Sequence, residues 1–226
     1  MFGRVVFRFM VTIFDDFLAA AAAAVELIGA RAVAERWEEP SALAGFTVGG
    51  LAAHLGWQVQ SARWALESAR PAPGAPVTGL GEHYAQAAWV GAALDAPVNL
   101  GIRDAGQERA KEGAAGQTRL TAEAREACAA VLGSGEVAPE TVIAVPWIEG
   151  RAMSAGDVIT TRVMELLVHG DDLAVSVGLE TPGYPQTAFT TVNELLLHVS
   201  TRRHGPVAVL RALSRAERAP ESISAF

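Results

Sequence analysis

The segment from Arg162 to Ala174, RVMELLVHGDDLA, carries residue types that could do chemistry. At about 100° per residue of an α-helix, four of its polar side chains fall within a sector of about 80°. These are Arg162, Glu165, His169 and Asp172. Most other residues of the segment are apolar, which is typical of a buried helix. The pattern therefore places a carboxylate and an imidazole one turn apart in the interior of a helical protein.

Two interpretations explain how such groups could be buried. Burying them without partners is costly, and either a metal ion or an ion-pair network would offset that cost. Glu165 and His169 are spaced i, i+4, so both can reach one metal ion. His54, on the apolar face of another predicted helix, is the best candidate for a third ligand, and such a set leaves a fourth position on Zn²⁺ for water or substrate. The alternative is a buried salt-bridge network of Arg162, Glu165 and His169.

Hydrophobic periodicity indicates the elements that must position these residues. It predicts helices over residues 14–36, 47–70, 82–94, 119–132, 155–177, 186–203 and 206–216. Thr47 is the expected N-cap of the second helix, and Gly178 is expected to end the helix that contains Glu165. Residues 95–116 are rich in glycine without a helical period and are read as a loop. Residues 141–147 predict one short strand, which Pro146 limits to an edge or isolated position. We expect an all-α bundle whose long loops are crossover connections.

The 226 residues are expected to form a single domain, 1–226, with residues 184–226 as a C-terminal helical extension. The first ten residues are apolar apart from two arginines. They are too short to span a bilayer, which takes about 20 residues, and they lack the cleavage site of a signal peptide. We expect residues 1–10 to be disordered or an incorrectly assigned start, with Met10 as the alternative first residue.

Composition excludes several classes of protein. Eighteen basic and 25 acidic residues give a net charge of −7, which argues against binding to nucleic acid. Cys128 is the single cysteine, so a disulfide scaffold is excluded. No phosphate-binding or dinucleotide-binding glycine motif is present. We expect a cytoplasmic protein with no nucleic-acid or membrane partner, and alanine-rich helix faces are consistent with a homodimer.

Three segments together resemble one known family. The first is FTVGGLAAHLGW at residues 46–57, and the most specific is the Arg-x-x-Glu-x-x-x-His-x-x-Asp-Leu-Ala pattern of residues 162–174. The third is the ending RRHGPVAVLRALSRAERAPESISAF at residues 202–226. They are similar to the second-helix histidine motif, the metal-helix motif and the common tails of the DinB-like superfamily. The closest resemblance is to its actinobacterial mycothiol-dependent maleylpyruvate isomerase family.

The resemblance implies a DinB-like four-helix bundle that holds one divalent metal, usually Zn²⁺, with Ni²⁺ among the other ions that such a site accepts. The family's ligands map onto His54, Glu165 and His169. Asp172 matches the aspartate that follows the ligand histidine and would orient an imidazole, and the alternative is a surface carboxylate at a helix end. Arg162 would either pair with Glu165 or hold a carboxylate.

The resemblance also implies mycothiol as the thiol cosubstrate. We therefore expect a metal-dependent thiol S-transferase or isomerase that activates this small thiol for attack on an electrophilic small molecule. Trp57, one turn after His54, is expected to wall the pocket. Arg202 and Arg203 either contact an anionic thiol or substrate or lie on a solvated face.

One departure from the family pattern bears on the reaction. The best-known isomerases carry an additional C-terminal domain that helps to form the active site, whereas only residues 178–226 follow the metal helix here. The sequence therefore does not decide between isomerisation of maleylpyruvate and transfer of a thiol to another electrophile. The alternative function is a non-catalytic metal- or small-ligand-binding protein with the same fold.

Overall fold

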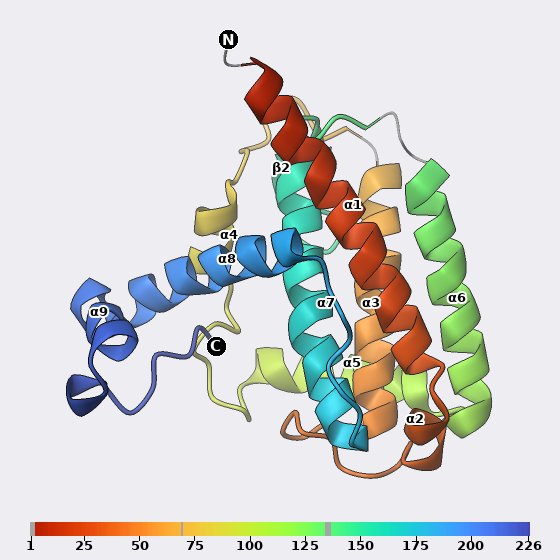
Figure 1. Ribbon diagram of the computed structural model, residues 1–226. Coiled ribbons are helices and arrows are strands. Elements are labelled where there is room, and N and C mark those ends of the chain that lie inside the picture. The colour runs from red at the N-terminus through yellow and green to blue at the C-terminus, as the bar shows by residue number, and fades with distance from the viewer. Residues whose placement is uncertain (1–2, 69, 134–136) are drawn as a thin grey trace.

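Four long helices form a bundle in which each helix packs closely against two others. The computed structural model describes residues 3–68, 70–133 and 137–226, with only the backbone for residues 3–12, 114 and 133. The four helices are α1 (Gly3–Ile28), α3 (Val48–Glu67), α6 (Gly113–Gly133) and α7 (Ala155–Val177). Both α1 and α3 pack along α6 and α7, so α1 and α3 occupy opposite corners (Figure 1). The predicted all-α bundle with crossover connections is confirmed.

The connections carry the shorter elements. Between α1 and α3 lies α2 (Arg31–Glu35), and between α3 and α6 lie α4 (Leu80–Ala85) and α5 (Pro97–Ala110). The α5 helix packs along α3. Between α6 and α7, β1 (Val142–Ala144) pairs antiparallel with β2 (Ala152–Ser154).

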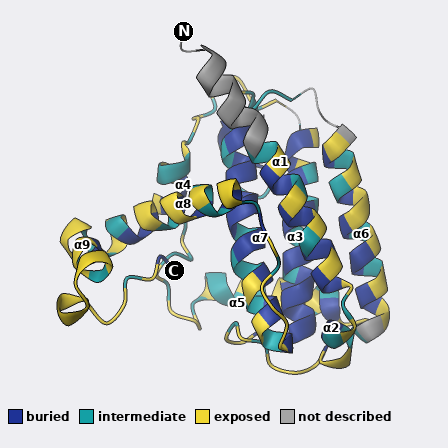
Figure 2. Cartoon of the chain, viewed as in Figure 1, coloured by how far each residue is buried: buried dark blue, intermediate teal, exposed yellow. Residues whose placement is uncertain are grey.

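The C-terminal part extends away from the bundle. Helix α8 (Gln186–His204) packs against α7 and α4, and α9 (Pro206–Ser214) lies at its outer end, followed by a short 3₁₀ helix, Ala216–Arg218 (Figure 1). Most buried residues line the interior of the bundle, whereas α9 is largely exposed (Figure 2). In the described part of the chain, no helix is both long and apolar enough to cross a membrane.

The two helices that carry the candidate ligands have well-defined ends. The Thr47 hydroxyl accepts a hydrogen bond from the Gly50 amide at 3.0 Å, which confirms the predicted N-cap of α3. Ser154 caps α7 in the same way, through the Asp157 amide at 3.0 Å. Gly178 ends α7 with a φ of 73°, a left-handed conformation that favours glycine. These caps fix where each turn of α3 and α7 begins.

Several predicted boundaries are wrong for local reasons. The helix predicted over 14–36 is split, because Ala30 is extended (ψ 141°) between α1 and α2. The helix predicted over 82–94 is limited to α4, and Gly91 beyond it has a φ of 73° that a helix excludes. The α1 helix begins at Gly3, well before residue 14, and residues 1–2 lie outside the described residues. The proposal that residues 1–10 are not part of the native protein stays a prediction.

The predicted strand is shorter than expected and is not isolated. It covers Val142–Ala144 within the predicted residues 141–147, and Ile143 lies opposite Met153 of β2. Pro146 lacks an amide hydrogen, so the pairing does not continue through it. The partner strand Ala152–Ser154 has only three residues, too few for an alternating pattern to be visible in the sequence.

The loop predicted over 95–116 is wrong, because most of it is the α5 helix and the first turn of α6. Pro97 begins α5 at a position where proline is favoured, and Gly106 serves packing rather than flexibility. A Cβ at Gly106 would lie 2.8 Å from the Gly50 carbonyl oxygen and 3.0 Å from the Phe46 ring. Glycine at this position therefore lets α5 approach α3, the helix that carries His54.

We predict opposite effects for two alanine substitutions in α5. Gly106→Ala should lower the free energy of unfolding by about 1–3 kcal/mol, because the backbone of α3 cannot easily move away from the new methyl group. Gly101→Ala meets no atom within 4 Å and should raise it by about 0.5–1 kcal/mol. Urea unfolding of the two variants measures both effects. If the two substitutions shift stability in the same direction, the close approach of α5 and α3 at Gly106 is contradicted.

Candidate metal centre

Two neighbouring bundle helices bring the three predicted ligands together. His54 lies on α3, and Glu165 and His169 lie one turn apart on α7. Glu165 Oε2 is 3.1 Å from His169 Nε2 and 4.0 Å from His54 Nε2. The two imidazole rings meet edge to face, with centroids 4.8 Å apart. One potential ligand atom from each residue lies within 4.8 Å of the other two.

The surroundings of this trio follow from the sequence of the two helices. Large apolar side chains of both helices, including Leu51, Leu55 and Leu166, are fully buried. The trio side chains themselves are 14–16% exposed. They are therefore largely, though not completely, shielded from bulk solvent.

The arrangement fits a single divalent cation. Metal–ligand distances of about 2.0–2.2 Å place the ligand atoms of a tetrahedral zinc site about 3.3 Å apart. Glu165 Oε2 lies 3.1 and 4.0 Å from the two imidazole nitrogens, and no two of the three ligand atoms are more than 4.8 Å apart, so side-chain movements alone would complete the set. Two imidazoles and one carboxylate are a common ligand set of catalytic zinc sites, which keep a fourth position open. Nickel and other divalent ions also accept this set.

Asp172 fixes the orientation of one imidazole. Its Oδ2 lies 3.0 Å from His169 Nδ1, and the opposite ring nitrogen, Nε2, faces Glu165. A carboxylate bonded to one ring nitrogen in this way holds the other as a ligand and increases its basicity. Asp171, the next residue, accepts a hydrogen bond from Thr181 instead. The contact supports the orienting role predicted for Asp172.

The three side chains of the trio differ in their pKa values and therefore in their charge at neutral pH. Burial raises the pKa of the Glu165 carboxyl, but the His169 hydrogen bond and nearby positive charges outweigh it and lower the pKa to about 2. Burial lowers the pKa of His169, but its bonds to Asp172 and Glu165 raise it to about 9. Burial and the charge on His169 lower the pKa of His54 to about 3. At neutral pH His169 is therefore protonated between two carboxylates, while His54 is neutral.

Arg162 forms its hydrogen bond with the side-chain amide of Gln58 rather than with a carboxylate. Its guanidinium is buried, lies 4.9 Å from the centre of the Trp147 ring and donates a hydrogen bond to Gln58 Oε1. The other end of that amide, Gln58 Nε2, lies 3.1 Å from His54 Nε2. Among the described residues, no carboxylate lies within ion-pair distance of Arg162. The predicted pairing of Arg162 with Glu165 is therefore wrong, because Gln58 takes the guanidinium.

Trp57, one turn after His54 on α3, contacts the guanidinium of Arg109, which the sequence pattern did not single out. The Arg109 guanidinium carbon lies 4.6 Å from the centre of the Trp57 ring. The positive charge of Arg109 contributes to the lowered pKa of His54. Arg109 was missed because its helix, α5, was read as a loop. That Trp57 walls a pocket stays a prediction.

The two arginines predicted to contact the thiol or substrate lie in the last turn of α8. Both are exposed, and Arg203 Nη1 donates to the Ser224 carbonyl oxygen at 3.4 Å. No hydrogen bond or ion pair within the described ranges links Arg202 or Arg203 to the trio. Their predicted binding role has no support from a contact and stays a prediction.

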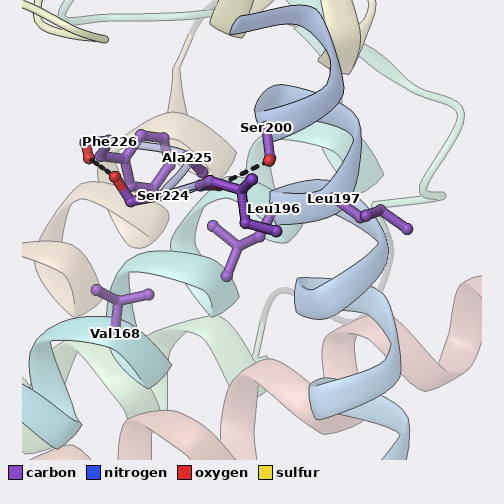
Figure 3. Close-up of a pocket in the computed structure, with 8 residues that line it drawn as sticks. Val168, Leu196, Leu197, Ser200, Ser224, Ala225 and Phe226 are labelled. Carbon is purple, nitrogen blue, oxygen red and sulfur yellow. Dashed lines mark hydrogen bonds between the residues drawn. The ribbon is translucent and has the colours of Figure 1, made fainter. Parts of the chain in front are cut away.

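An apolar hollow of about 360 Å³ lies beside α7. Its walls are Val168, apolar side chains of α8 and residues 223–226 of the C-terminal segment (Figure 3). Val168 immediately precedes His169, and the Ser200 hydroxyl donates to the Ile223 carbonyl oxygen at 2.7 Å, which anchors the segment. Phe226 packs against Trp89, with ring centroids 4.8 Å apart. Nothing in the sequence pattern indicated that the C-terminal segment returns to α7.

Comparison with known proteins gives one match. The family model described as the mycothiol maleylpyruvate isomerase N-terminal domain matches residues 18–174. That range contains His54, Glu165, His169 and Asp172, and it ends before α8. No significant match was found among curated proteins or among solved structures.

We predict that metal uptake by the metal-free protein releases about one proton per ion near neutral pH. The ion must displace a proton from His169, because the raised pKa of this imidazole keeps it protonated at neutral pH. The affinity of the protein for the ion should therefore fall about tenfold for each unit by which the pH is lowered. Above a pH of about 9 the affinity should no longer change with pH. Titration calorimetry with Zn²⁺ in buffers of different ionisation enthalpy counts the protons. Asp172→Asn should reduce the number released, because it removes a contact that raises the pKa of His169, whereas Asp171→Asn should not. Uptake without proton release would contradict the protonation state assigned to His169.

Proposed function

The chain belongs to the family of the mycothiol maleylpyruvate isomerase N-terminal domain, and we propose that it is a metal-dependent thiol S-transferase or isomerase. The observation that carries the proposal is the convergence of His54, Glu165 and His169 to within 4.8 Å in a chain of this family. Mycothiol is the proposed thiol and a small electrophile the proposed second substrate. Zn²⁺ is the proposed metal, and the cytoplasm of an actinobacterium the proposed location.

The trio would hold the ion, and the ion would supply one effect. A divalent cation held by the three residues would lower the pKa of a bound thiol, so that its sulfur would be present as thiolate at neutral pH. The sulfur would then bond to an electrophilic carbon. In an addition, the alkene π bond breaks and the neighbouring carbon takes up a proton from water; in a displacement, the leaving group departs with the bonding electrons. In an isomerisation, that proton would afterwards be lost and the thiolate expelled. No nucleophile from the protein is needed.

The protein's own residues prepare the site for this chemistry. Asp172 holds the His169 ring so that Nε2 faces the centre, and Gln58, fixed by Arg162, faces His54. Low exposure of the trio limits competing water. Arg109 adds positive charge beside the site, which favours an anionic sulfur over a neutral one.

We predict that mycothiol binds to the Co²⁺-loaded protein through sulfur. A thiolate-to-cobalt charge-transfer band should appear in the near ultraviolet when mycothiol is added, because thiolate binds the open position of such a site. S-methyl mycothiol, which has no ionisable thiol, should not produce the band. Turnover is then followed as loss of free thiol in the presence of a panel of activated alkenes.

Two variants serve as the matched pair. His54→Ala should lose both the band and the turnover, whereas His198→Ala, which removes an exposed imidazole on α8, should keep both. A loaded protein that shows neither band nor thiol-dependent turnover would contradict the proposal and favour a non-catalytic metal-binding protein of the same fold.

A further inference from the structure

Tyr84 carries a buried polar atom that nothing in the described structure satisfies. The residue lies on α4 and is 3% exposed. Its hydroxyl has no hydrogen-bond partner among the described residues. Its ring is held by aromatic neighbours on two sides, with centroids 5.1 Å from His83 and 6.1 Å from Phe226. The ring is therefore fixed, and the hydroxyl cannot easily turn towards solvent.

Tyr84 packs against Phe226, which lines the apolar hollow together with Val168, the residue that precedes His169. Helix α4 packs against α7, the helix that carries two members of the trio. Burial raises the pKa of Tyr84, the nearby charge of Glu165 raises it further, and Arg162 opposes the effect. The charges of Glu165 and Arg162 on α7 therefore act on Tyr84, and its phenol keeps its proton as a hydrogen-bond donor.

A buried hydroxyl without a partner is rare in folded proteins, since the cost of removing it from water is not recovered. Glu165 does not recover it, because no hydrogen bond joins its carboxylate to the Tyr84 hydroxyl. Tyr184 shows the ordinary situation in the same protein: its hydroxyl donates to the Leu166 carbonyl oxygen at 3.3 Å. Replacing tyrosine by phenylalanine at these two positions therefore compares a hydroxyl that makes no hydrogen bond within the protein with one that does.

We propose that Tyr84 donates a hydrogen bond to an oxygen atom of the electrophile bound beside His54, Glu165 and His169. The assignment rests on the proposed function for the identity of that ligand. The donor is prepared in advance, because the aromatic contacts hold the ring before the ligand arrives. A hydroxyl that is costly in the free protein and satisfied in the complex contributes to ligand binding more than one that must first break a bond within the protein.

The test compares Tyr84→Phe with Tyr184→Phe in the full chain. Without metal, Tyr84→Phe should melt at the same temperature as the wild type or higher, and Tyr184→Phe should melt lower. In the Co²⁺-loaded protein, acetohydroxamate serves as an oxygen-donor probe of the open position, followed by the visible cobalt bands. Its affinity should fall by roughly 10- to 100-fold in Tyr84→Phe and remain unchanged in Tyr184→Phe. In turnover with mycothiol, kcat/KM should fall in Tyr84→Phe only, with the mycothiol charge-transfer band retained.

Other outcomes separate this inference from the proposed function. If Tyr84→Phe lowers the melting temperature as Tyr184→Phe does and leaves the hydroxamate affinity unchanged, the hydroxyl is structural and the assignment is overturned. If hydroxamate binding weakens in Tyr84→Phe but the wild type shows no thiol band or turnover, Tyr84 is still a ligand-binding residue and thiol transfer is the part that fails. A wild-type protein that takes up no cobalt overturns both.

Discussion

The contact between the Glu165 carboxylate and two imidazoles in the bundle interior is the constraint on which the site depends. A carboxylate removed from water is stable only with positive charge or donors close to it. The His169 proton supplies this charge in the metal-free protein, and the proposed cation would replace it. The contact requires α3 and α7 to lie side by side, with their helical turns in a fixed relation. The caps at Thr47 and Ser154 define where the two helices begin, and direct packing of α3 against α7 holds them side by side.

The surrounding residues make the two histidines unequal. Asp172 and Glu165 hold His169 from both sides, so its pKa is raised to about 9. Gln58 is held by Arg162 and faces His54, whose pKa falls to about 3. The His54 imidazole is therefore already neutral and can bind a metal ion directly, whereas the His169 imidazole must first lose a proton. Such asymmetry couples metal affinity to pH without requiring any movement of the backbone.

The central residues of the site could be predicted from the sequence because helical geometry fixes their relation. Glu165, His169 and Asp172 share a face of one helix by spacing alone, and His54 interrupts an apolar face of another. The contacts between distant segments could not be predicted in this way. Arg162 bonds with Gln58 rather than Glu165. Arg109 lies on a helix whose glycines resemble a loop in the sequence, although one of them, Gly106, serves close packing in the fold.

Metal content tests the central claim most directly. The full chain is purified without chelator or histidine tag, and its metals are counted by elemental analysis before and after dialysis against Zn²⁺. The account predicts about one divalent ion per chain, lost in both His54→Ala and His169→Ala and kept in His198→Ala. A metal-free wild-type protein that cannot be loaded would contradict it, and would leave the trio as a buried ion-pair network.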